Sequence, residues 1–264
     1  MERQHRRSGF RVAPPRAPWT RSRGAVISLV LSSLVCGCGN DVTDAPAITI
    51  SGQITDATGT PIEGVHINFV YEFVAAAASG NAAQQSASGG LTLFPNPFER
   101  TTTLLFEVEG AAAAMLDMFD ANENPVRSLV LTSRLPAGRH SVIWDGRDEG
   151  QRQLRNGLYH ARLVLGAPAT SVETVRAFRN EIDGGSFAET WVTRTDADGK
   201  FAIPRSTLPV GASFMGTDTQ GAPGALQVVD DMVRLWATLP ASSPVHRSTR
   251  ISVAQNVFVQ LQFP

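Results

Sequence analysis

The chain of 264 residues has two cysteines, Cys36 and Cys38, separated by a single glycine. A pair of thiols this close could form a disulfide or contribute two ligands to a metal site. A Cys36–Cys38 disulfide would close a ring too small to be relaxed. A metal site would need a second pair of ligands, and the neighbouring sequence offers none. Both interpretations stay open as alternatives, and neither accounts well for the pair.

The segment in front of these cysteines has the layout of an export signal. Residues 1–23 carry seven arginines, and residues 24–35 carry no charge. This apolar run is too short to span a bilayer, which needs roughly 20 residues. A positive flank followed by a short apolar core is typical of a secretory signal peptide. We therefore expect residues 1–37 to be a signal peptide rather than a buried core helix, which would hardly begin with seven arginines.

The sequence V-C-G-C at residues 35–38 resembles the lipobox of bacterial lipoproteins, in which an aliphatic, a free and a small position precede a modified cysteine. The resemblance implies that Cys38 carries a diacylglyceryl group on sulfur and, after cleavage, a further acyl chain on its amine. Several acyl chains, at about 0.8 kcal/mol per buried methylene, form a stable anchor. Residues 38–46 would then be a tether. Gly39, in the place of an aspartate, favours the outer membrane or cell surface within the bacterial envelope.

Two pairs of aspartates could bind calcium or act as a general acid and base. Asp196 and Asp198 belong to a D-x-D-G pattern, but an EF-hand loop needs an acid where this chain has Arg194. We therefore expect a tight hairpin turn there, with the aspartates accepting hydrogen bonds from backbone amides. Asp145 and Asp148 could form a catalytic pair, although a structural turn is the favoured interpretation.

We expect no catalytic, cofactor or metal site. The sequence contains no nucleophile-elbow, zinc-protease, P-loop or dinucleotide motif. The histidines beyond the signal segment lack the spacing of metal ligands: His66, His140, His160 and His246. The first three fall on outward positions of expected strands, so we expect solvated side chains. An enzyme is therefore disfavoured.

The composition fits a globular protein, with 42% hydrophobic and 18% charged residues. The 23 glycines and 16 prolines favour many turns and short strands over long helices. Removal of the signal segment, with its seven arginines and one glutamate, shifts the formal net charge from −1 to −7. An acidic body lacks the basic stripe that nucleic acid requires. We therefore expect no nucleic-acid partner.

The two ends of the mature chain resemble one family of small β-sandwiches. Residues 48–56 and 62–69 alternate between apolar and polar side chains on either side of a turn rich in Asp, Gly and Pro. This strand–turn–strand sequence resembles the opening of carboxypeptidase regulatory-like domains, which have a prealbumin-like topology. The next signature of that family, T-D-x-x-G-x-F, occurs at residues 195–201, more than a hundred residues late. We therefore expect a split domain over residues 47–73 and 187–264.

The intervening sequence resembles a second β-sandwich family. Residues 91–166 contain P-N-P-F, A-G-x-H-x-V-x-W-D-G-R-D and N-G-x-Y-x-x-R-L in this order. These motifs resemble the Ig-like domain of flagellar hook-capping proteins and, equally, the type A sorting domains of the type IX secretion system. Trp144 and Tyr159 are expected in the core. A flexible linker is expected at residues 74–90, which lack an apolar pattern, and a second linker is expected at residues 167–186.

These observations predict an all-β protein of two β-sandwich modules, one prealbumin-like and one Ig-like, with the second inserted into the first. The expected function is that of a non-catalytic, membrane-anchored surface lipoprotein in a structural, adhesion or polymer-binding role. An accessory factor in envelope assembly or secretion is the alternative. The expected partners are the lipid bilayer, through acylated Cys38, and an envelope protein or polysaccharide. A carbohydrate-active enzyme, the third interpretation, would require acids from both modules to converge in one cleft.

Overall fold

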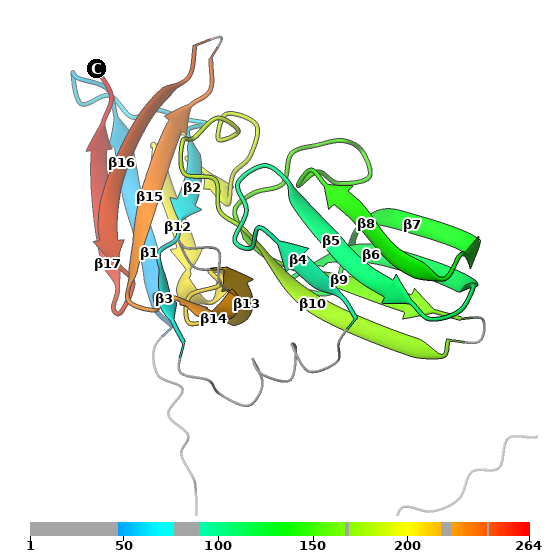
Figure 1. The fold of residues 1–264 in the computed structure, drawn as a ribbon. Helices are drawn as coiled ribbons and strands as arrows, with labels where there is room; N and C mark the ends of the chain where they lie inside the picture. The colour runs from blue at the N-terminus through cyan, green and yellow to red at the C-terminus, as the bar shows by residue number, and fades with distance from the viewer. Residues whose placement is uncertain (1–46, 77–89, 167–168, 218–222, 242) are drawn as a thin grey trace, which may run out of the picture. The chain divides into compact units, whose positions relative to one another are not determined.

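The computed structural model describes residues 47–76, 90–166, 169–217, 223–241 and 243–264 (Figure 1). Within these ranges every regular element is a strand, apart from one turn of 3-10 helix, η1 (Arg205–Thr207). The predicted all-β, sandwich-type fold is confirmed. The signal peptide, the tether and most of the expected linker at residues 74–90 lie outside the described residues.

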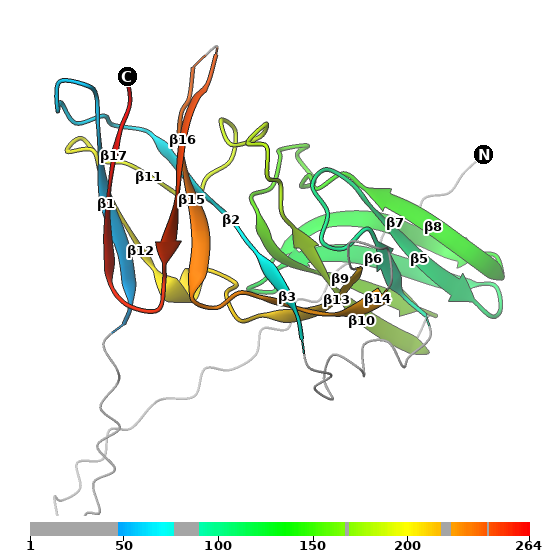
Figure 2. The same ribbon diagram turned by 60° about the vertical axis from the view of Figure 1, so that its left-hand side comes forward.

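Ten strands from the two ends of the described chain share three sheets, in the orders β12-β1-β17, β11-β2-β15-β16 and β13-β14-β3. We call this group the first sandwich (blue, yellow, orange and red in Figures 1 and 2). Its strands are β1 (Thr49–Thr55), β2 (His66–Val70), β3 (Phe73–Ala75), β11 (Thr193–Arg194), β12 (Lys200–Pro204), β13 (Ser213–Thr217), β14 (Pro223–Val228), β15 (Met232–Leu239), β16 (Val245–Ser252) and β17 (Val257–Gln262).

Strand β1 is the central strand of the sheet β12-β1-β17. It pairs antiparallel with β12, with Ile50 opposite Ile203, and parallel with β17, with Ile50 opposite Val257. The segments around Ile50 and Phe201, which belong to the two halves of the expected split domain, therefore share one sheet. Because successive strand residues point to opposite faces, Ile50 and Ile54 are fully buried while their neighbours are partly exposed.

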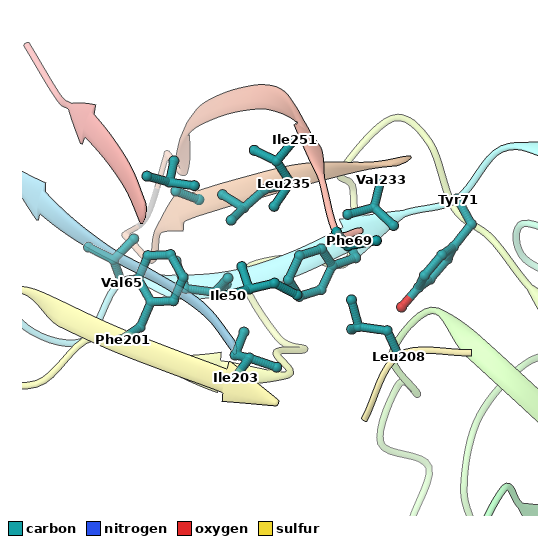
Figure 3. Packing of buried hydrophobic residues seen from close by; sticks show 14 of the residues in the cluster. Ile50, Val65, Phe69, Tyr71, Phe201, Ile203, Leu208, Val233, Leu235 and Ile251 are labelled. Atoms are coloured by element: carbon teal, nitrogen blue, oxygen red, sulfur yellow. The ribbon is translucent and has the colours of Figure 1, made fainter. Parts of the chain in front are cut away.

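The first core is the apolar cluster that these sheets enclose (Figure 3). Ile50 from β1 packs in it with Phe69 from β2 and Leu235 from β15, and all three side chains are at most 1% exposed. Burial of one such side chain stabilises a fold by about 1.5–3 kcal/mol. The core therefore depends on strands that are distant in sequence.

Seven consecutive strands form the second sandwich, with the sheet orders β10-β9-β6-β7 and β4-β5-β8 (green in Figure 1). They are β4 (Thr92–Phe94), β5 (Thr102–Val108), β6 (Ala112–Asp120), β7 (Pro125–Leu135), β8 (Gly138–Trp144), β9 (Gly157–Leu165) and β10 (Ser171–Arg179). Trp144 is fully buried in the second core and packs against Phe98, with ring centroids 5.3 Å apart, and Tyr159, at 5.5 Å. Trp144 and Tyr159 are thus core aromatics, as expected.

Residues 171–179 do not form the linker expected there. They form strand β10, which pairs along its whole length with β9. The alternating pattern of β10 places Ala177 in the second core and its neighbour Phe178 in the first. Phe178 stacks on Phe214 of β13, with centroids 5.2 Å apart. One strand therefore contributes to both cores, and the described residues belong to one compact unit.

Candidate functional site

The structure places none of the predicted site residues, because Cys38 lies outside the described residues. The acids considered for calcium binding or catalysis are described, and they lie in turns. Asp196 Oδ1 accepts the backbone N–H groups of Asp198 (3.0 Å) and Lys200 (2.8 Å). Asp145 accepts from Arg127 (2.6 Å) and from the N–H of Arg147 (3.1 Å). The structural interpretation of these turns is confirmed.

The Asp196 turn is one of four hairpin turns with the same hydrogen bonds. In each, the aspartate Oδ1 accepts a hydrogen bond from the backbone N–H of the residue four positions later. The carbonyl of that later residue accepts a hydrogen bond from the backbone N–H of the aspartate. The other three begin at Asp56, Asp120 and Asp148. Burial opposes ionisation of Asp120 and Asp148, but hydrogen bonds to the carboxylates outweigh it and hold the pKa of both below the usual value.

His66 departs from the sequence prediction, since it is buried rather than solvated. The segment at residues 180–192 covers the outer face of β2 and β15, where Phe187 packs edge-on against Trp236 at 5.4 Å. His66 Nδ1 lies 3.3 Å from the Phe187 carbonyl, and its ring lies 4.4 Å from that of Trp191. Burial lowers the pKa of His66. His140 and His160 are partly exposed.

A cleft of about 1090 Å³ opens where the two sandwiches meet, and residues of both line it. Its buried lining includes Tyr71 from the end of β2 and Asn156 and Tyr159 from the start of β9. Its exposed lining includes Arg155 and Trp191. Ligand sites occur preferentially at such junctions, where two packed bodies provide a concave surface. This cleft is the candidate functional site.

A fully buried polar network lies beneath the cleft. Asn156 Nδ2 donates to the carbonyls of Phe69 (3.0 Å) and Glu181 (2.8 Å). Its Oδ1 accepts from the Glu181 N–H (2.8 Å) and from Arg179 Nη1 (3.0 Å). Arg179 also pairs with Glu181 at 2.5 Å, and both side chains are at most 3% exposed. Because all four hydrogen-bonding positions of the Asn156 amide are used, the network fixes the start of β9 against the end of β2.

Tyr71 is held next to this network by its backbone. Its N–H donates to Asn180 Oδ1 and its carbonyl accepts from Asn180 Nδ2, both at 3.0 Å. Its ring meets Phe178 edge-on at 5.5 Å, and Figure 3 shows the hydroxyl at the margin of the first core. Although the residue is only 3% exposed, the hydroxyl makes no hydrogen bond with another described residue, and it lines the cleft. Burial raises the pKa of Tyr71.

Acids from both sandwiches line the cleft, namely Asp120 and Asp148 from the second and Glu189 from the first. A general acid in catalysis needs a raised pKa, whereas Asp120 and Asp148 have lowered pKa values because they are engaged in their own turns. Arg155 also lines the cleft and pairs with no acid among the described residues. The arrangement supplies hydrogen-bonding and charged groups for binding.

The chain matches no protein-family model and no curated protein. Across the described ranges, no cluster of three or more His, Cys, Asp and Glu side chains is able to hold a metal ion. The same ranges contain no helix with the length and apolar character needed to cross a membrane. The site itself is therefore the main guide to function.

Sequence reasoning did not single out Tyr71 or Trp191, although both line this cleft. Tyr71 follows β2 directly, and Trp191 lies in a segment without apolar periodicity. No local pattern marks either residue, since their proximity depends on how β2, β9 and residues 180–192 come together.

Proposed function

We propose that this chain is a lipid-anchored, non-catalytic binding protein of the bacterial cell envelope, exposed at the outer membrane or cell surface. Acylated Cys38 would hold it to the bilayer. The cleft at the junction of the sandwiches would hold a polymer or protein of the envelope. The residues matching the two family signatures support a split carboxypeptidase regulatory-like domain that carries a hook-capping-type Ig-like domain.

The cleft is the observation that carries the binding role. Its volume, about 1090 Å³, is slightly above the range of roughly 300–1,000 Å³ typical for ligand pockets. The Tyr71 hydroxyl on its lining has no hydrogen-bond partner among the described residues. The hydroxyl is therefore free to donate and accept hydrogen bonds with a ligand group in the cleft.

The anchoring role is tested by substitution of the two cysteines. Cys38→Ala should abolish incorporation of labelled palmitate and release the protein from the membrane fraction, because one acyl chain or none is too weak an anchor. Cys36→Ala is the matched control and should leave both properties unchanged, since Cys36 would be removed with the signal peptide. Labelling that persists in Cys38→Ala would refute the anchoring site.

The binding role is tested with the mature lipoprotein in detergent and solubilised envelope. Capture of an envelope component that is lost on Arg155→Gln would support the cleft as the site, because Arg155 lines it and has no acidic partner among the described residues. Arg134→Gln, on the exposed part of β7, is the control. Equal capture by wild type and Arg155→Gln would place recognition elsewhere.

A further inference from the structure

The junction cleft continues into a second hollow. A hollow of about 400 Å³ lies on the outer side of the sheet β12-β1-β17, and it shares Thr193 and Ala202 with the cleft. The two therefore meet at the neighbouring strands β11 and β12. A continuous path of this kind accommodates an elongated ligand better than a compact one.

An exposed aromatic ring stands at the far end of this path. Phe258 is 60% exposed, and it belongs to the lining of the hollow. It lies in one row with Ser51 and Ala202 across β17, β1 and β12. These two small side chains leave the ring face accessible from the hollow.

Hydrogen-bonding groups flank the ring. The next row of the same face, about 7 Å along the strands, holds Gln260, Gln53 and Lys200. Gln53 Nε2 donates to the Asp198 carbonyl at 3.0 Å, while Gln260 is exposed. An aromatic face beside amide and hydroxyl groups matches a ligand with both apolar C–H faces and hydroxyl groups.

The charges along the path are balanced. Four acids line the two hollows: Asp120, Asp148, Glu189 and Asp196. Four bases do so as well: Arg152, Arg155, Arg194 and Lys200. A polyanion or a polycation would meet as many repulsive as attractive groups. The lining is therefore complementary to a neutral polymer.

We propose that the path from the junction cleft to Phe258 binds a neutral polysaccharide, with a sugar ring stacked on Phe258. The proposal rests on the binding function proposed above and names the chemical class of its ligand. A sugar presents C–H groups on its ring faces and hydroxyls at its edge, so it matches the aromatic ring and the amides of neighbouring rows. An extended chain can contact both hollows, which adjoin at Thr193 and Ala202.

The test is isothermal titration of the detergent-solubilised mature lipoprotein with four soluble polysaccharides. Three are neutral, namely mixed-linkage β-glucan, glycogen and galactomannan, and polygalacturonate is the anionic probe. At least one neutral polymer should bind, and Phe258→Ala should weaken it about tenfold, equivalent to ~1.4 kcal/mol for a lost aromatic contact. Ile143→Ala is the control, since it removes a 69% exposed apolar side chain from the second sandwich.

Three results would overturn the proposal. They are the absence of binding to every neutral polymer, unchanged binding by Phe258→Ala, and preferential binding of polygalacturonate. The envelope capture experiment separates this inference from the binding function itself. An envelope component captured equally well by wild type and by Phe258→Ala would leave the binding function standing and exclude the polysaccharide path.

Discussion

The ion pair between Arg179 and Glu181 can be tested directly. Arg179→Met keeps most of the volume of the side chain and removes its hydrogen bonds to Asn156 (3.0 Å), Glu181 (2.5 Å) and Ser186 (3.2 Å). Glu181 is 3% exposed and would stay buried in this variant. Its carboxylate would keep the hydrogen bonds from the backbone N–H and the hydroxyl of Ser186, but not the one from Arg179. Loss of one partner of a buried pair costs about 3–5 kcal/mol, a large part of a typical folding stability of roughly 5–15 kcal/mol.

Urea denaturation measures this loss, as a fall in the midpoint at an unchanged m-value. Arg100→Met is the matched control, because Arg100 pairs with Asp183 at the surface, with side chains 75% and 49% exposed. Such exposed pairs contribute about 0–1 kcal/mol. The double variant Arg179→Met with Glu181→Gln should lose less stability than the sum of the losses of the two single variants. The reason is that the neutral amide leaves no buried charge. A loss for Arg179→Met no larger than that for Arg100→Met would refute the reasoning.

Two further predictions concern the turns and a buried histidine. Gln151 occupies a left-handed conformation (φ 62°), which costs an L-residue about 1–2 kcal/mol, so Gln151→Gly should raise the urea midpoint. Gly199→Ala, at the equivalent position of another turn, should lower it, because the new Cβ would lie 2.4 Å from the Ile54 carbonyl oxygen; the reverse order of the two midpoints would contradict this. The pKa of His66 is lowered from 6.5 by burial, so the unfolded chain takes up the proton first. Stability should therefore fall as the pH drops below about 6.5. His66→Gln should show a shallower fall than wild type in denaturation series at several pH values; equal slopes for the two proteins would exclude His66 as the cause.

Much of the fold follows from local sequence patterns. Alternating apolar residues predicted β1, and the structure buries Ile50 and Ile54 on one face of it. The turn at Asp196 also follows from local chemistry, because its hydrogen bonds join residues no more than four positions apart. These elements are predictable since the interactions that define them lie within a short stretch of chain.

Strand β10 shows why other parts were not predicted. Its residues alternate, but Val175 and Ala177 face the second core while Phe178 faces the first. The last three residues of β10 are all buried, so this end of the strand lacks the polar face on which recognition by alternation depends. His66 illustrates the same limit, since an outward position on β2 becomes buried only when residues 180–192 cover it.

The polar junction has a consequence for binding. An apolar contact between the sandwiches could slide, whereas the Asn156 side chain makes directional hydrogen bonds to Phe69, Arg179 and Glu181. Such polar pairing favours one arrangement of the two sandwiches over other arrangements in which their apolar surfaces would pack equally well. The walls of the cleft, which belong to both sandwiches, are thereby set before a ligand arrives. Because a preorganised site loses less conformational entropy on binding, even the few polar groups around Tyr71 can yield useful affinity.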